Sequence, residues 1–257
     1  MKDWLTKDIL ITVKAYPNPS KKYGETICVA GITIDDKKWV RLYPIPYRDL
    51  DEEQKFPKYA IIRAKISKPS DDKRPESFRV NADSIKVVDH LDTSDKWVKR
   101  KEIVLPTLDK SMCEILNKLQ TENKSLGVFK PRDIKFYWQK ARPRDEDVRK
   151  ACYAQLSFFN KTKNAIEVIP FDFRFKFFCQ EEPECKGHDF SIIDWEIGQA
   201  YRSWRTNYKT EDLLLEKIKE RWLDRICFAK NDIYFYVGNM KRFRDNFMIL
   251  GVFYPSK

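Results

Sequence analysis

Residues 171–178 read Phe-Asp-Phe-Arg-Phe-Lys-Phe-Phe. Phenylalanine takes every second position from 171 to 177, and Asp172, Arg174 and Lys176 take the positions between them. Successive side chains of a strand point to opposite faces, so this alternation predicts a strand with one buried and one solvated face. We therefore expect the phenylalanines to lie in a core rather than on a base-stacking platform, and the strand to belong to an antiparallel sheet.

Short β-rich runs separated by turn residues fill the amino-terminal part of the chain. The runs cover residues 8–15, 25–34, 38–43, 59–66 and 77–88. Five strands of this length within about ninety residues are typical of a small closed sheet of the OB type. The sequence therefore predicts an OB-like sub-domain over residues 1–105.

Apolar residues at helical spacing mark three later segments. The first runs from Leu108 to Leu119 and predicts a helical connector over residues 106–127. Two amphipathic helices are expected around residues 193–204 and 215–226.

Two strands are expected near the end of the chain, at residues 232–237 and 247–254, around a basic turn. They complete a carboxy-terminal α+β sub-domain over residues 128–257. The expected fold class is α+β, mainly antiparallel, with OB-like small barrels and a few packed helices.

The chain carries 50 basic and 39 acidic side chains, which gives a formal net charge of +11. Such an excess attracts polyanions over long range, so nucleic acid, either DNA or RNA, is the expected partner. No apolar run approaches the length of about 18 residues that suggests a membrane span, and the first residues do not resemble a leader. These features favour a cytoplasmic protein without membrane contact.

A Cys/His block follows the phenylalanine run: Cys179-Gln-Glu-Glu-Pro-Glu-Cys185-Lys-Gly-His188. Thiolate and imidazole are preferred zinc ligands, and the intervening turn would bring the two sulfurs toward one point. The block predicts a structural zinc site formed by Cys179, Cys185 and His188, with Cys227 as the fourth ligand.

The fourth position has alternatives in Cys152, Asp189 and Glu184. A pair of reduced, half-buried cysteines beside a helix-capping histidine is the reading without a metal. Six cysteines scattered along the chain fit free or metal-bound thiols in a reducing compartment better than a disulfide framework.

Common enzyme motifs are absent from the sequence. It contains no phosphate-binding glycine loop, no His-Glu-x-x-His and no Gly-x-Ser-x-Gly, and it has only two histidines for general-base work. We therefore assign no catalytic residue. A metal-dependent nuclease that uses Asp194 or Glu196, with Lys186 nearby, is the alternative function, and a protein-interaction scaffold is the third.

Three windows, at residues 130–150, 201–209 and 241–244, interleave basic and aromatic residues. This mixture offers phosphate pairing together with base stacking. Trp204 also lies on the apolar stripe of its predicted helix, which favours packing for that ring. The residues expected to contact nucleic acid are Lys135, Trp138, Lys140, Arg142, Arg144, Arg202, Trp204, Arg205, Lys209, Lys241 and Arg242.

Residues 16–31, Tyr-Pro-Asn-Pro-Ser-Lys-Lys-Tyr-Gly-Glu-Thr-Ile-Cys-Val-Ala-Gly, are followed by Lys38-Trp39-Val40-Arg41. This stretch, residues 16–43 in all, resembles the start of the dual OB-containing domain, a family of uncharacterised prokaryotic domains. Leu42 stands where the family pattern has proline. The resemblance implies a pair of OB-like barrels with a ligand surface, and its prokaryotic character suggests an accessory role in defence or mobile-element control. The Cys/His block is similar to one in hypothetical bacterial proteins.

Overall fold

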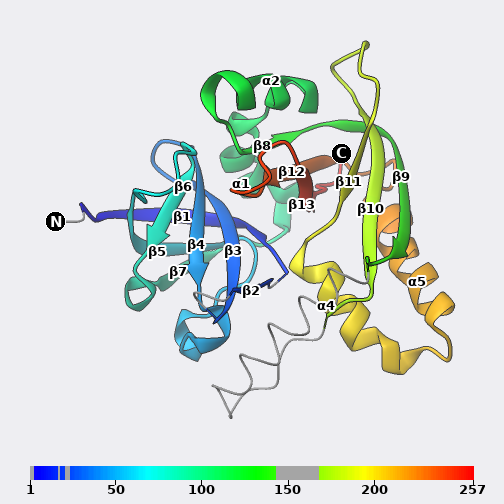
Figure 1. Cartoon of the computed structure of the whole chain (residues 1–257), viewed down its shortest axis with the longest axis horizontal. Coiled ribbons are helices and arrows are strands. Elements are labelled where there is room, and N and C mark those ends of the chain that lie inside the picture. Colours follow the sequence, from blue (N-terminus) through cyan, green and yellow to red (C-terminus); the bar gives the residue numbers. More distant parts are fainter. Residues whose placement is uncertain (1–2, 17, 21–23, 143–167) are drawn as a thin grey trace.

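The computed structural model describes residues 3–16, 18–20, 24–142 and 168–257. An amino-terminal barrel lies beside a carboxy-terminal part that is built on two three-stranded sheets (Figure 1). The fold is therefore α+β, as the sequence predicts. Among the described residues, no helix is both long and apolar enough to cross a membrane.

The barrel has the strand order β1-β3-β4-β6-β5, and β5 returns to pair with β1, which closes it. Neighbouring strands are antiparallel except β4 and β6, which are parallel. This Greek-key order of five strands is that of an OB fold. The strands are β1 (Leu5–Lys14), β3 (Gly24–Thr33), β4 (Trp39–Ile45), β5 (Ala60–Ser67) and β6 (Ser77–Val80). Two edge strands, β2 (Asn18–Ser20) and β7 (Lys86–His90), pair with β3 and β5.

The apolar run in β1 is buried on both faces of the strand. Ile9 and Ile11 point into the barrel core. Leu10 and Val13 point the other way, into a cluster that also contains Tyr236 of the carboxy-terminal part. The barrel and the carboxy-terminal part therefore share a hydrophobic core along β1.

The carboxy-terminal part contains one sheet in the order β11-β10-β9 and one in the order β13-β12-β8. Their strands are β8 (Leu126–Phe129), β9 (Pro131–Lys140), β10 (Phe171–Cys179), β11 (His188–Ser191), β12 (Tyr234–Asn239) and β13 (Phe247–Phe253). The second barrel implied by the resemblance does not appear in the described carboxy-terminal residues, because they form these separate sheets instead.

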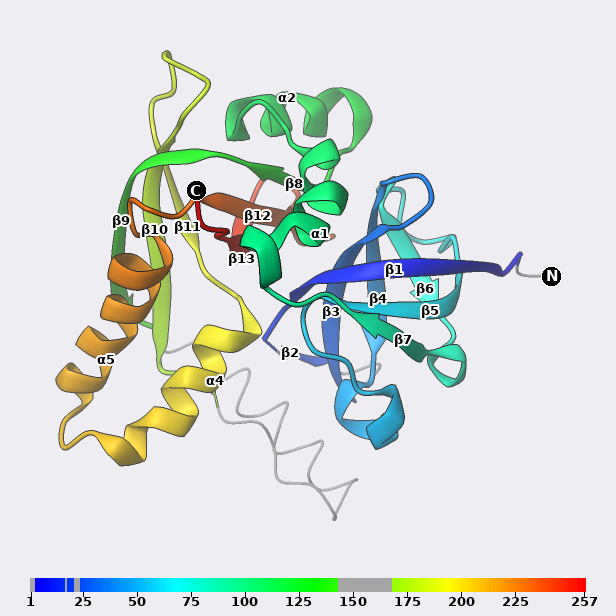
Figure 2. The same ribbon diagram turned by 180° about the vertical axis from the view of Figure 1, so that it is seen from behind.

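Four α-helices are described, and α4 and α5 lie beside the sheet that contains β10 (Figure 2). The helices are α1 (Ser94–Val104), α2 (Met112–Glu122), α4 (Trp195–Trp204) and α5 (Glu211–Lys219), which continues as a π-helical turn (Glu220–Ile226). Short 3-10 turns lie at Tyr47–Asp49, Glu52–Gln54, Ala82–Ser84, Leu105–Thr107 and Arg205–Asn207.

The predicted alternation of residues 171–178 is confirmed in β10. Phe173, Phe175 and Phe177 are buried, and they pack with the apolar faces of α2, α4 and α5. Arg174 and its polar neighbours lie on the opposite face of the sheet.

A buried ion pair joins the barrel to α4. Asp194 is the N-cap of α4, and its carboxylate accepts a hydrogen bond from the Glu196 N–H at 3.1 Å. Both carboxylate oxygens also lie 2.7 Å from the Nζ of Lys58, just before β5. Burial raises the pKa of Asp194 to about 6, although the Lys58 ammonium opposes this shift.

Lys14, at the end of β1, lies at the same junction. Its Nζ donates to the Phe56 carbonyl at 3.0 Å and lies 4.0 Å from the ring centroid of Tyr47 and 5.3 Å from that of Trp195. Among the described residues, no carboxylate forms an ion pair with this ammonium group. Burial, and then repulsion from Lys58, lowers the pKa of Lys14 to about 8 against the attraction of Glu196 and Asp194.

We expect Lys14→Met to raise the free energy of unfolding at pH 7 by about 1–3 kcal/mol. The folded-state pKa of about 8 lies below the ordinary value of 10.5, so the charged amine destabilises the folded state at pH 7. This penalty fades as the pH rises toward 10.5, so the gain of the variant shrinks at pH 9.5. Urea unfolding of both proteins at pH 7 and 9.5 measures the difference. A variant that is less stable at both pH values would show that the contacts of the ammonium outweigh its burial.

Candidate metal centre and cleft

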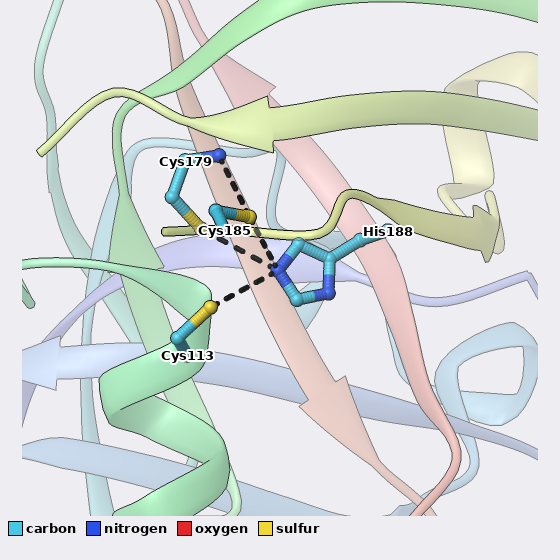
Figure 3. Close-up of side chains that lie close together, drawn as sticks. All are labelled: Cys113, Cys179, Cys185 and His188. Atoms are coloured by element: carbon cyan, nitrogen blue, oxygen red, sulfur yellow. Dashed lines mark hydrogen bonds between the residues drawn. The ribbon is translucent and has the colours of Figure 1, made fainter. Parts of the chain in front are cut away.

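Three cysteines and one histidine converge where α2 meets the β10–β11 hairpin (Figure 3). Cys113 lies in the first turn of α2, Cys179 ends β10, Cys185 lies in the following turn and His188 begins β11. Their four potential ligand atoms all lie within 4.8 Å of one another.

The spacing of these atoms fits a tetrahedral ion. The Nε2 of His188 lies 3.4 Å from the Sγ of Cys185, 3.5 Å from that of Cys179 and 3.6 Å from that of Cys113. Metal–sulfur and metal–nitrogen bonds of about 2.3 and 2.0–2.1 Å, at tetrahedral angles, place the two ligand atoms about 3.5 Å apart. The three nitrogen–sulfur distances therefore match those of a tetrahedral metal site.

Backbone N–H groups point at two of the sulfurs. The N–H of Met112 donates to the Sγ of Cys179 at 3.3 Å, and the N–H groups of Cys179 and Gly187 donate to the Sγ of Cys185 at 3.4 Å. Gly187 has a φ of +90°, which other residues rarely adopt, and this conformation shapes the turn that carries its N–H. Such outer donors orient and stabilise metal thiolates.

The electrostatics of the cluster favour the binding of a cation. Burial, followed by the two neighbouring sulfurs, raises the pKa of Cys113 to about 12. Burial opposes ionisation of Cys185, but hydrogen bonds from the backbone N–H groups of Cys179 and Gly187, and from the neighbouring cysteine side chains, bring its pKa below the ordinary value. Burial lowers the pKa of His188, which leaves a neutral imidazole able to bind a metal. Three thiolates this close repel one another unless a cation neutralises them.

Local capping places Cys113 in the cluster. The side chain of Ser111, the N-cap of α2, accepts from the Glu114 N–H at 3.0 Å, and the Glu114 carboxylate accepts from the Lys110 N–H at 2.8 Å. This arrangement fixes the first turn of α2. On β11, His188 faces the metal centre, and its neighbour Asp189 pairs with Arg174 on the other face of the sheet.

A cleft of about 1160 Å³ lies between part of the barrel and the carboxy-terminal sheets. Its lining comes from β3, β4 and the turn before β6 on the barrel side. The other wall comes from β10, β11 and the turn between β12 and β13. Lys140, Arg142, Lys241 and Arg242 all line this cleft.

Buried polar groups join the two walls. Arg41 of β4 donates to the hydroxyl and carbonyl oxygens of Ser125 at 2.8 and 2.9 Å, and the Glu76 carboxylate accepts from the same hydroxyl at 2.8 Å. Arg74 pairs with Asp72 at 2.6 Å and donates to the Asn239 carbonyl at 3.0 Å. These bonds cross from the barrel to the start of β8 and the end of β12.

Residues 108–257 match the family described as domain of unknown function DUF8757. The chain belongs to this family. Residues 5–106 also match the domain of unknown function DUF8758. No curated protein matches the chain. Neither family match names the dual OB-containing domain. All four members of the Cys/His cluster lie in the DUF8757 region, whereas the barrel lies in the DUF8758 region.

Of the four predicted metal ligands, the DUF8757 region brings together Cys179, Cys185 and His188. The fourth member is Cys113 and not Cys227, which follows the π-helical turn and packs against the core. Burial raises the pKa of Cys227 to about 12. The only sequence signal for Cys113 was a cysteine within a predicted helix. Cys152 lies outside the described residues, and Asp189 and Glu184 lie outside the cluster.

The basic residues predicted to contact nucleic acid lie in several parts of the structure. Lys140, Arg142, Lys241 and Arg242 line the cleft. Lys135 is exposed on the polar face of the sheet that contains β9. Arg202, Arg205 and Lys209 lie at the end of α4 and just beyond it, away from the cleft lining. Arg144 lies outside the described residues.

Both tryptophans that were expected to stack on bases pack against the core. Trp138 is half-buried, with its ring centroid 6.4 Å from that of Phe136. Trp204 is half-buried, with its ring centroid 6.3 Å from that of Trp222. Parity along β9 places Trp138 on the same face as Phe136, so the core covers part of the Trp138 ring.

The carboxylates considered for a nuclease are held in ion pairs. Asp194 is 2% exposed and bound to Lys58, which also lies 3.3 Å from Glu196. Within the described part of the chain, the Cys/His cluster is the one group of three or more potential ligands that could hold a metal.

We expect the purified protein to contain one metal ion per chain, and Cys113→Ser to lose most of it, because each thiolate supplies one of four bonds. Elemental analysis of dialysed protein measures the metal content. Cys227→Ser is the matched control and should retain the wild-type content. Equal metal loss in both variants, or an unchanged content in Cys113→Ser, would contradict the assignment of Cys113.

Proposed function

We propose that the chain is a nucleic-acid-binding protein whose ligand lies in the cleft, and that the Cys/His cluster holds a structural zinc ion. The observation that carries this proposal is the orientation of the barrel. Its second and third strands, β3 and β4, face the cleft, as does the turn between its fourth and fifth strands. OB folds bind oligonucleotides with these parts.

Several residue types on the barrel wall suit such a ligand. Tyr43 of β4 is an aromatic residue that is 39% exposed, and Arg79 of β6, which pairs with Asp71 at 3.0 Å, carries positive charge. The barrel residues that line the cleft on β3 are Thr26, Cys28 and Ala30.

Positive charge on the other wall supports a polyanionic ligand. Lys140 ends β9 and Arg142 follows it, while Lys241 and Arg242 lie in the turn after β12. The net charge of +11 strengthens attraction of phosphates from a distance. Asp172 and Asp189 on this wall pair with Arg174, which offsets their repulsion of a phosphate backbone.

The donor set favours zinc as the metal. A Cys₃His site with four protein ligands leaves no open position for substrate, which is typical of a structural zinc ion. Here the ion would fasten α2 to the β10–β11 hairpin, whose polar face lines the cleft. The five described cysteines are free, which fits the reducing conditions of a cytoplasmic protein. The resemblance of residues 16–43 to the dual OB-containing domain extends the proposal to an accessory role in prokaryotic defence or mobile-element control.

The double variant Lys241→Ala, Arg242→Ala should bind nucleic acid about tenfold more weakly, because two phosphate contacts are lost. The magnitude of the slope of log affinity against log salt should fall by about 1–2. Fluorescence anisotropy with labelled oligonucleotides over a salt series measures both quantities. The charge-matched control is Arg205→Ala with Lys209→Ala, outside the cleft lining.

Two results would count against this proposal. Equal weakening in both double variants would mean that general surface charge, and not the cleft, holds the ligand. Cleavage of the oligonucleotide that depends on magnesium or manganese would assign the chain to the nucleases instead.

A further inference from the structure

We infer that the cleft binds a single strand, and that Tyr43 and Phe243 stack on its bases from opposite walls. This inference rests on the proposed function and deepens it. It names the form of nucleic acid that fits the cleft and the side chains that contact its bases.

The first observation is the exposure of these two rings. Tyr43, in β4 of the barrel, is 39% exposed, and Phe243, in the turn between β12 and β13, is 55% exposed. Both rings line the same cleft, one from each wall. Part of each ring is therefore exposed in the cleft, whereas most other rings among the described residues pack into a core.

The second observation is the sequence around Phe243. Lys241 and Arg242 precede it and Arg244 follows it, so one short turn carries an aromatic ring between cations. Stacking on a base together with pairing to the adjacent phosphates requires this mixture. Lys241 pairs with Asp71 at 3.0 Å, and Arg242 and Arg244 place two further cations next to the ring in sequence, so the charge favours a polynucleotide over an apolar protein partner.

The third observation is the size and rigidity of the cleft. The volume of about 1160 Å³ is slightly larger than that of small-molecule sites. It is far smaller than the space taken by a duplex turn about 34 Å long. The walls cannot part easily, because Arg41, Arg74 and Lys58 tie the barrel to the carboxy-terminal part through buried bonds.

The structure of a duplex also argues for a single strand. The faces of its bases are covered by neighbouring base pairs, so the rings of Tyr43 and Phe243 could reach only the terminal pairs. An unstacked strand presents each base face to a ring. Stacking of this kind tolerates many sequences, because every base has a π-face.

The experiment compares a labelled 12-nucleotide DNA strand, the same RNA strand and the matching DNA duplex by anisotropy across a salt series. We expect the wild-type protein to bind the single strands at least tenfold more tightly than the duplex. Tyr43→Ala and Phe243→Ala should each weaken single-strand binding by about 5- to 150-fold, with the salt slope unchanged because the phosphate contacts remain.

Phe228→Ala is the matched control, since Phe228 is 48% exposed and lies outside the cleft lining. Its affinity for each oligonucleotide should equal that of the wild type. Circular dichroism of all variants checks that they fold.

The possible outcomes distinguish failure of the single-strand inference from failure of the proposed function. A duplex bound as tightly as a single strand would overturn the single-strand inference and leave the proposed function standing. Folded ring variants with unchanged affinity would overturn the stacking roles. Absence of binding to all three oligonucleotides at low salt would overturn the proposed function itself.

Discussion

The burial of β1 on both of its faces determines how the molecule is arranged. One face supplies Ile9 and Ile11 to the barrel core, and the other supplies Leu10 and Val13 to the core shared with the carboxy-terminal part. Each of these side chains contributes about 1.5–3 kcal/mol when it is fully buried. The shared core thus holds the barrel in one position against the carboxy-terminal sheets, and the two walls of the cleft keep a fixed separation.

Charged groups at this junction add specificity more than stability. Lys58 with Asp194, and Arg41 with Ser125 and Glu76, lose most of their hydration, and the desolvation penalty offsets much of their attraction. Their directional bonds are satisfied in one relative orientation of the two parts. The hydrophobic cluster along β1 provides the affinity between barrel and sheets, and these polar bonds select the geometry.

Local patterns in the sequence predicted the helices and strands, but not the contacts between elements that are distant in sequence. The period of two in residues 171–177 correctly predicted the buried face of β10, and the strand-rich first ninety residues correctly predicted an OB-like barrel. Cys113 was missed because it reaches Cys179 through the packing of α2 on β10, across 66 residues of sequence, that is 179 − 113. Composition alone does not show which face of an element is covered, so it did not indicate that the Trp138 ring packs against the core.

The placement of His188 and Asp189 on β11 links the metal centre to the cleft. Neighbouring residues of a strand face opposite ways, so a single peptide bond joins a member of the Cys/His cluster to a residue of the cleft wall. Under the proposed function, order in the hairpin contributes to the binding of both the ion and the polynucleotide. Thermodynamic linkage makes such a coupling reciprocal: the free energy by which the ion would strengthen polynucleotide binding equals that by which the polynucleotide would strengthen ion binding.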